Sequence, residues 1–168
     1  DLVPIYRTGI MGPTEALGWQ PDDSPPQSNL RPGALTWTMD GQPCGPVFPG
    51  LSEDERRVGY SFVTLWPSTY VVAHLDYVRA VRLVPMGPEK TRLIAEWYFL
   101  PETLAQPGFD AAAVADFAKI VIGQDGAASE MNHRGMASPA FKAARLMPEE
   151  YEIFRFHEWI RAEMEATP

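Results

Sequence analysis

Asp125 is the residue with the clearest capacity for chemistry, because it is a carboxylate within an otherwise apolar helical pattern. Apolar residues recur at steps of three and four positions before it, which places them on one side of a helix. The members of this stripe are Val114, Phe117, Ala118, Val121 and Asp125. A carboxylate buried there as an ion is costly unless a cation pairs with it. A nearby arginine, a protonated state or a metal ion would each resolve that cost, and a solvated aspartate would avoid it.

The residues around Asp125 affect the helix that carries it. Gly123 and Gly126 flank the aspartate. Each weakens a helix by about 1 kcal/mol relative to alanine, so the helix can bend there or let another group approach closely. Glu130 and Arg134 are four residues apart, a spacing that predicts an ion pair on the helix surface. We therefore assign this pair a structural role.

Three histidines are the other candidate metal ligands, and the sequence favours none of them. His133 follows Asp125 by eight residues, about 12 Å along a helix that rises roughly 1.5 Å per residue, so the two side chains would not reach one ion. We expect His74 to pack within a sheet or to hydrogen-bond across it. His157 lies among Phe and Trp residues of the last helix, where we expect a structural role.

Residue composition and periodicity distinguish the elements that position these residues. Residues 58–100 contain runs of β-branched and aromatic residues, and the segment PMGPEK at 85–90 marks a chain reversal, so we expect an antiparallel meander. In the last strand, one face carries Leu93, Ala95, Trp97 and Phe99, and the other carries Arg92, Glu96 and Tyr98. This alternation predicts one packed face and one wetter face.

Two helices are expected after the strands. The first begins at Asp110, a typical N-cap, and contains Asp125. The second begins at Pro148 and is amphipathic, with a core-facing stripe of Ile153, Phe156, Ile160 and Met164. Strands followed by helices predict an α+β fold, in which a long helix and a C-terminal helix pack on one face of an antiparallel sheet.

Residues 1–57 are rich in proline and glycine, so we expect them to be irregular. One short strand is predicted at 34–41, where Leu35, Trp37 and Met39 alternate with threonines before an Asp-Gly pair. The stretch is either a surface loop or a lid or partner-binding arm.

Composition limits the function classes. A chain of 168 residues suits one domain. Its net charge of −8 argues against nucleic acid and anionic membranes as partners, since both require an excess of Lys and Arg. The single cysteine, Cys44, excludes an internal disulfide and a thiolate zinc site. Without a signal peptide or a long apolar run, we expect a soluble, cytoplasmic protein that binds small molecules or proteins.

A motif lies around the aspartate: Gln124-Asp125, then Ser129-Glu130, then His133-Arg134-Gly135. It resembles the signature of the catalytic domain of Rieske non-haem iron oxygenases, the large subunits of ring-hydroxylating dioxygenases and related monooxygenases. That family typically has Glu-Asp, three residues, Cys-Glu, two residues and Gln-Arg-Gly. Gln124, Ser129 and His133 depart from the pattern, whereas the aspartate is kept. The resemblance therefore implies that Asp125 is the carboxylate ligand of a mononuclear Fe(II).

Further segments extend the resemblance over most of the chain. They are Leu65-Trp66-Pro67, Val84-Pro85, and the closing stretch from Glu149 to Trp159. The likeness implies a helix-grip type of fold and O₂ activation at Fe(II), with electrons from NAD(P)H through ferredoxin and reductase partners. It also implies that an organic substrate is hydroxylated, and we expect this substrate to be aromatic. The parent protein is expected to be a homotrimer. Phe117 and Val121 would line the substrate pocket, and Leu65, Trp66 and Tyr70 are weaker candidates.

Other parts of the family's machinery have no counterpart in the sequence. The family's iron also takes two histidines, and its Rieske [2Fe–2S] cluster takes two cysteines and two histidines. We therefore expect residues 1–168 to be the C-terminal portion of a mononuclear-iron catalytic domain, with the Rieske domain and the His-ligand segment absent. The isolated chain would then be inactive, as a fragment or the product of a split gene. Two other roles stay open: a non-enzymatic small-molecule-binding domain, and an interaction half that completes a separately encoded iron site.

Overall fold

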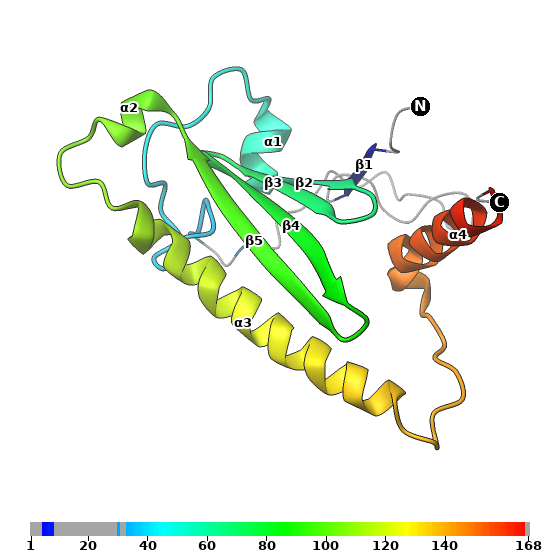
Figure 1. The fold of residues 1–168 in the computed structure, drawn as a ribbon. Coiled ribbons are helices and arrows are strands. Elements are labelled where there is room, and N and C mark those ends of the chain that lie inside the picture. Colours follow the sequence, from blue (N-terminus) through cyan, green and yellow to red (C-terminus); the bar gives the residue numbers. More distant parts are fainter. Residues whose placement is uncertain (1–4, 9–29, 31–32, 167–168) are drawn as a thin grey trace.

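The structure, a computed structural model, describes residues 5–8, 30 and 33–166. Its centre is a five-stranded antiparallel sheet in which each strand pairs with the next along the chain (Figure 1). The strands are β1 (Ile5–Thr8), β2 (Tyr60–Leu65), β3 (Thr69–His74), β4 (Tyr77–Gly87) and β5 (Lys90–Phe99). The predicted meander is confirmed, including the reversal after Gly87, which pairs with Lys90.

The two faces of the sheet differ as the alternation predicts, except at Leu93, which was expected on the packed face and is 42% exposed. Pairing aligns Phe62 with Val72, Val72 with Arg79, and Arg79 with Trp97, so these side chains share one face. Trp97 and Phe99 are half-buried on that face. On the opposite face, Arg92, Glu96 and Tyr98 are exposed, and Glu96 pairs with Arg82 at 3.7 Å. The first face is therefore the packed one.

The region before β2 is more structured than we expected. Besides β1, it contains helix α1 (Glu53–Val58). Ser52 and Glu55 form a capping box, in which each side chain bonds the backbone N–H of the other residue. The sequence signal for this cap, Ser followed three residues later by Glu, was present in a stretch whose proline content predicted irregular structure.

The predicted strand at 34–41 is wrong. Residues 33–41, hereafter the cavity loop, form a series of bends closed by a hydrogen bond of 2.7 Å from Leu35 N to Gly41 O. Leu35 and Met39 are exposed, whereas Thr36, one of the threonines that alternate with them in sequence, is only 2% exposed. The reason is tertiary, because the Thr36 hydroxyl is drawn inward by a buried carboxylate 40 residues away.

The long helix α3 (Ala111–Met136) begins after Asp110, whose side chain accepts from Ala112 N at 2.8 Å, so the predicted N-cap is confirmed. α3 lies along the sheet (Figure 1). The first three turns are packed, with Val114, Ala115 and Ala118 buried, whereas all residues from 123 to 136 are exposed among the described residues. The α+β class with a long helix against an antiparallel sheet is confirmed.

The remaining helices are short or peripheral. α2 (Pro101–Leu104) follows β5, and the 3₁₀ helix η2 (Pro148–Glu150) leads into α4 (Tyr151–Ala166). α4 contacts Trp66 in the β2–β3 turn through Phe156, at 5.8 Å between ring centroids, and Trp159, at 5.5 Å. The predicted core stripe of this helix is wrong at Ile153 and Met164, which are 44% and 73% exposed, since the turn reaches only one side of the helix. Within the described residues, no helix combines the length and apolarity needed to cross a membrane.

Candidate functional site

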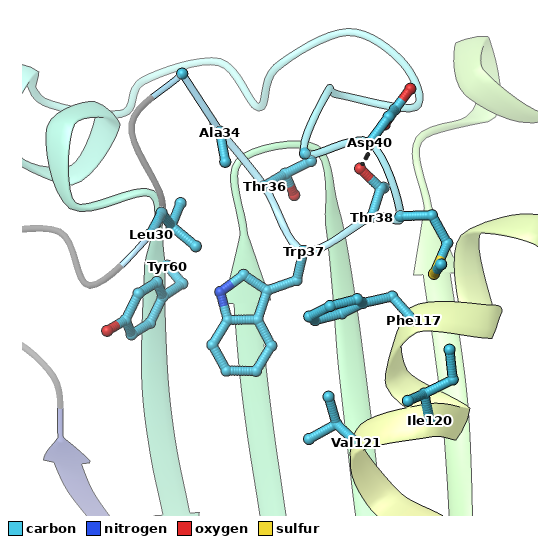
Figure 2. Close-up of a pocket in the computed structure, with 13 residues that line it drawn as sticks. Leu30, Ala34, Thr36, Trp37, Thr38, Asp40, Tyr60, Phe117, Ile120 and Val121 are labelled. Carbon is cyan, nitrogen blue, oxygen red and sulfur yellow. Dashed lines mark hydrogen bonds between the residues drawn. The ribbon is translucent and has the colours of Figure 1, made fainter.

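A cavity of about 730 Å³ lies between the cavity loop, strand β2 and helix α3 (Figure 2). Its volume is within the range of small-molecule sites, which are roughly 300–1,000 Å³. The described residues that line it are Leu30, Gly33, Ala34, Thr36, Trp37, Thr38, Met39, Asp40, Gly41, Tyr60, Phe117, Ile120 and Val121. The lining is mainly apolar and aromatic, as expected for a site that holds an organic ligand.

Trp37 is the central side chain of this site. Figure 2 shows its indole between Tyr60 of β2 and Phe117 of α3. The ring centroids lie 5.4 Å from Tyr60 and 6.3 Å from Phe117, with tilted and edge-on orientations that suit aromatic pairs. Trp37 also contacts Phe62 at 5.8 Å and His74 at 5.3 Å. From its place in the cavity loop, the Trp37 indole thus contacts both the sheet and helix α3.

Asp40 is the one charged side chain among the described lining residues. Its carboxylate accepts from the Gln42 backbone N–H and from the Thr38 hydroxyl, each at 3.0 Å. These hydrogen bonds, that of Gln42 first, hold the pKa of Asp40 below its usual value. Asp40 is exposed at the rim, so the cavity presents aromatic rings inside and a negative charge at its edge.

Behind Trp37 lies a buried group of polar residues on the packed face of the sheet. His74 is 3% exposed and stacks on Tyr77 with ring centroids 4.3 Å apart. The guanidinium of Arg79 lies 5.7 Å from the centre of the Trp37 ring, a cation–π contact. Both His74 nitrogens, and Nε and Nη1 of Arg79, have no hydrogen-bond partner within the described part of the chain.

Burial decides the protonation state of His74. Loss of solvent contact, followed by the positive charge of Arg79, lowers the pKa of His74 to about 3. The imidazole is therefore neutral at pH 7. The prediction that His74 packs within the sheet is confirmed, whereas His157, for which we expected a structural role among aromatic residues, is exposed on α4.

Cys44 follows the cavity loop and is half-buried. Burial, together with a hydrogen bond to Asp76 and the charge of that residue, raises the pKa of the Cys44 thiol to about 12. A thiol with such a pKa remains protonated at neutral pH, so it is a poor nucleophile.

Asp125 lies on α3, one turn beyond the cavity residue Val121, and its side chain is exposed. The apolar stripe before it is buried or half-buried, so the packing predicted for the stripe holds up to Val121 and does not extend to the aspartate. No described residue approaches the neighbouring glycines, since a Cβ added at Gly123 or Gly126 would meet nothing within 4 Å. The assignment of Asp125 as an iron ligand stays a prediction.

The described residues do not by themselves form the iron site that the family uses. A site of two histidines and one carboxylate needs three such side chains together. Among the residues that the structure describes, no group of three His, Cys, Asp or Glu side chains is placed to hold a metal ion. His133 is exposed farther along the same helix, which continues to Met136, and belongs to no such group among the described side chains. Glu130 and Arg134 form the predicted surface pair at 4.0 Å.

Of the predicted pocket residues, Phe117 and Val121 line the cavity, whereas Leu65, Trp66 and Tyr70 are not among its described lining residues. Trp66 packs on α4 instead. Sequence reasoning missed the contribution of the cavity loop, because the Leu-Trp-Met alternation was interpreted as a strand. The bends that place Trp37 carry only one usable sequence signal, the Asp-Gly pair at 40–41 that favours a turn.

Comparison with known proteins gives the family. Residues 6–166 match the model of the ring hydroxylating alpha subunit (catalytic domain). The chain is also similar to a choline monooxygenase, chloroplastic, from Atriplex hortensis, with 26% identity over 112 residues, which are 66% of this chain and 25% of that protein. The aligned part thus spans about a quarter of the length of that relative. Because the family model matches nearly the whole chain, and because the fold agrees, this chain belongs to the ring-hydroxylating alpha subunit catalytic-domain family.

Proposed function

We propose that this chain forms part of the catalytic domain of a terminal oxygenase and provides the cavity that holds an organic substrate for oxygen insertion. Family membership supports the reaction class. The observation that carries the proposal is the cavity between the cavity loop and α3, because it opens beside Val121, one turn before the aspartate of the family motif. The side chains of this chain would bind the substrate, orient it and exclude water from it.

Within this proposal, Asp125 is the carboxylate ligand of a mononuclear Fe(II), which would supply O₂ activation when bound. The two further ligands would have to come from outside the described residues. Ferredoxin and reductase electron donors, a [2Fe–2S] Rieske cluster in another part of the protein, a homotrimeric assembly and a cytoplasmic location belong to the same proposal. They rest on the family and on composition.

The substrate that suits this lining is neutral or cationic. Trp37, Tyr60 and Phe117 offer apolar surface to an aromatic ring, which is the substrate class that the family resemblance implies. A methylated ammonium compound is the second candidate. The rings would attract such a cation through their π faces, Asp40 adds a negative charge, and one relative is a choline monooxygenase by name. An anionic substrate would find no Lys, Arg or His among the described lining residues.

The test of the oxygenase proposal uses Asp125→Ala in the complete protein with its electron donors. The matched control is Asp116→Ala, which removes an exposed aspartate from the same helix. We expect the Asp125 variant to lose iron and turnover while it still binds a neutral apolar probe, and the control to keep all three properties. Retention of stoichiometric iron and product formation by Asp125→Ala would reject the ligand assignment.

The same proteins separate the other candidate roles. A non-enzymatic binding domain would bind the probe but yield no product under any electron supply. An interaction half would acquire iron only when mixed with the polypeptide that carries the histidine ligands. The charge class of the substrate is decided by competition between three ligands for the cavity. They are the cation benzyltrimethylammonium, its neutral isostere neopentylbenzene and the anion phenylacetate.

A further inference from the structure

Asp76 occupies an unusual place, because it is a carboxylate in a hairpin turn and yet is completely buried. Leu75 and Asp76 connect β3 to β4, and such turns normally face solvent. Each of the two carboxylate oxygens of Asp76 accepts one hydrogen bond from the region of the cavity loop. The Thr36 hydroxyl donates to Oδ1 at 2.7 Å, and the Cys44 backbone N–H donates to Oδ2 at 2.7 Å.

The residues on either side of Asp76 bind the same segment. The Tyr77 hydroxyl donates to the backbone carbonyl of Trp37 at 2.8 Å, and the Leu75 carbonyl accepts from the Phe48 backbone N–H at 2.7 Å. Residues 75–77, the β3–β4 turn and the first residue of β4, thus form four hydrogen bonds with residues 36–48. All four hydrogen bonds are short, and those that end on a carboxylate are among the stronger kinds in proteins.

The segment held in this way forms one wall of the cavity. Residues 36–41 all line the cavity, and Trp37 is the side chain that contacts β2 and α3. The two ends of the loop meet closely, because Leu35 N donates to Gly41 O at 2.7 Å and a Cβ added at Gly41 would lie 2.7 Å from Cβ of Ala34. The position of the whole wall relative to the sheet therefore depends on the contacts of residues 75–77.

We propose that Asp76, together with the Tyr77 hydroxyl, is a positioning group for the substrate: it fixes the cavity loop so that Trp37 faces α3 across the cavity. Neither Asp76 nor Tyr77 lines the cavity, so both would act on a bound molecule only through the loop. The functional meaning of this arrangement rests on the proposed function, since it assumes that the cavity takes the substrate. The mechanical part stands on the hydrogen bonds alone.

The experiment compares Asp76→Asn and Tyr77→Phe in the complete protein. Asn keeps the shape of the side chain but offers an N–H₂ group where one of the two loop donors points, and Phe removes only the hydroxyl. The matched controls are Asp54→Asn and Tyr98→Phe, whose side chains are exposed in α1 and on the opposite face of the sheet. The probe is N-phenyl-1-naphthylamine, a neutral fluorescent compound, and its Kd is measured by titration.

A second readout follows Trp37 itself. The protein contains five tryptophans, so labelling with 5-fluorotryptophan gives up to five ¹⁹F resonances, and Trp37→Phe identifies that of Trp37. We expect Asp76→Asn to raise the probe Kd about tenfold and Tyr77→Phe about threefold, with a shift of the Trp37 resonance in both. If Asp76→Asn does not fold, Tyr77→Phe carries the test alone.

An unchanged Kd and an unchanged Trp37 resonance in the folded variants would overturn the proposal, as would equal effects in the controls. A lower thermal stability with an unchanged Kd would also overturn it, because it would show that Asp76 only stabilises the fold. Probe binding requires neither iron nor electron donors. Failure of the oxygenase assay is therefore distinguishable from failure of this inference.

Discussion

The buried imidazole of His74 leads to a prediction about pH. The ring stacks on Tyr77, contacts Trp37 and faces the guanidinium of Arg79, with no acidic side chain bonded to it within the described residues. Burial first, and the charge of Arg79 second, lower the pKa of His74 from 6.5 to about 3. The folded protein therefore holds this histidine neutral in a pH range where the unfolded chain protonates it.

The sign of the effect follows from proton linkage. Below pH 6.5 the unfolded state binds a proton at His74 that the folded state does not bind until about pH 3, so stability falls as the pH falls through this window. Each pH unit lowers the free energy of unfolding by at most about 1.4 kcal/mol. Between pH 8 and pH 5 this amounts to about 2 kcal/mol, a large part of a stability of roughly 5–15 kcal/mol.

Two measurements test this reasoning in the complete protein. Histidine ¹³C labelling should show that the His74 resonance does not titrate between pH 8 and pH 5. Denaturant unfolding over the same range should show that His74→Phe reduces the pH dependence of stability by about 2 kcal/mol, whereas His157→Phe, at an exposed position, does not reproduce that change. A His74 resonance that titrates near pH 6.5, or an identical pH slope in His74→Phe, would refute the account of its burial.

Three further predictions follow from the site. Gly123→Ala and Gly126→Ala should each raise the free energy of unfolding by about 1 kcal/mol, because an added Cβ meets open space in α3; a loss of stability in thermal unfolding would show that another group occupies that space in the complete protein. Cys44 should react with a thiol reagent at pH 8 far more slowly in the native protein than after unfolding, since a pKa of about 12 leaves roughly one thiolate in 10⁴; rapid stoichiometric labelling would contradict this. Asp40→Asn should weaken binding of benzyltrimethylammonium about threefold and leave neopentylbenzene unaffected, in competition with the fluorescent probe, and equal effects on both ligands would show that its charge does not reach the cavity.

The family could be inferred from sequence because it is carried by a short local motif. The spacing of Asp125, Glu130 and Arg134 lies within one helix, and the model of the family matches residues 6–166. The site is different. Phe117 and Val121 could be named because they share the helical stripe with Asp125, but Trp37 could not, since its place depends on bends rather than on a repeat.

Local periodicity was sufficient for the meander, for the two faces of β5 and for the start of α3 at Asp110. These features depend on residues two, three or four positions apart, so the chain itself encodes them. Only the tertiary structure decided which threonine of the cavity loop is buried, and that His74 is neutral. The hydrogen bond from Thr36 to Asp76 joins positions 40 residues apart, and the energy of such a contact depends on where the rest of the chain places its two ends.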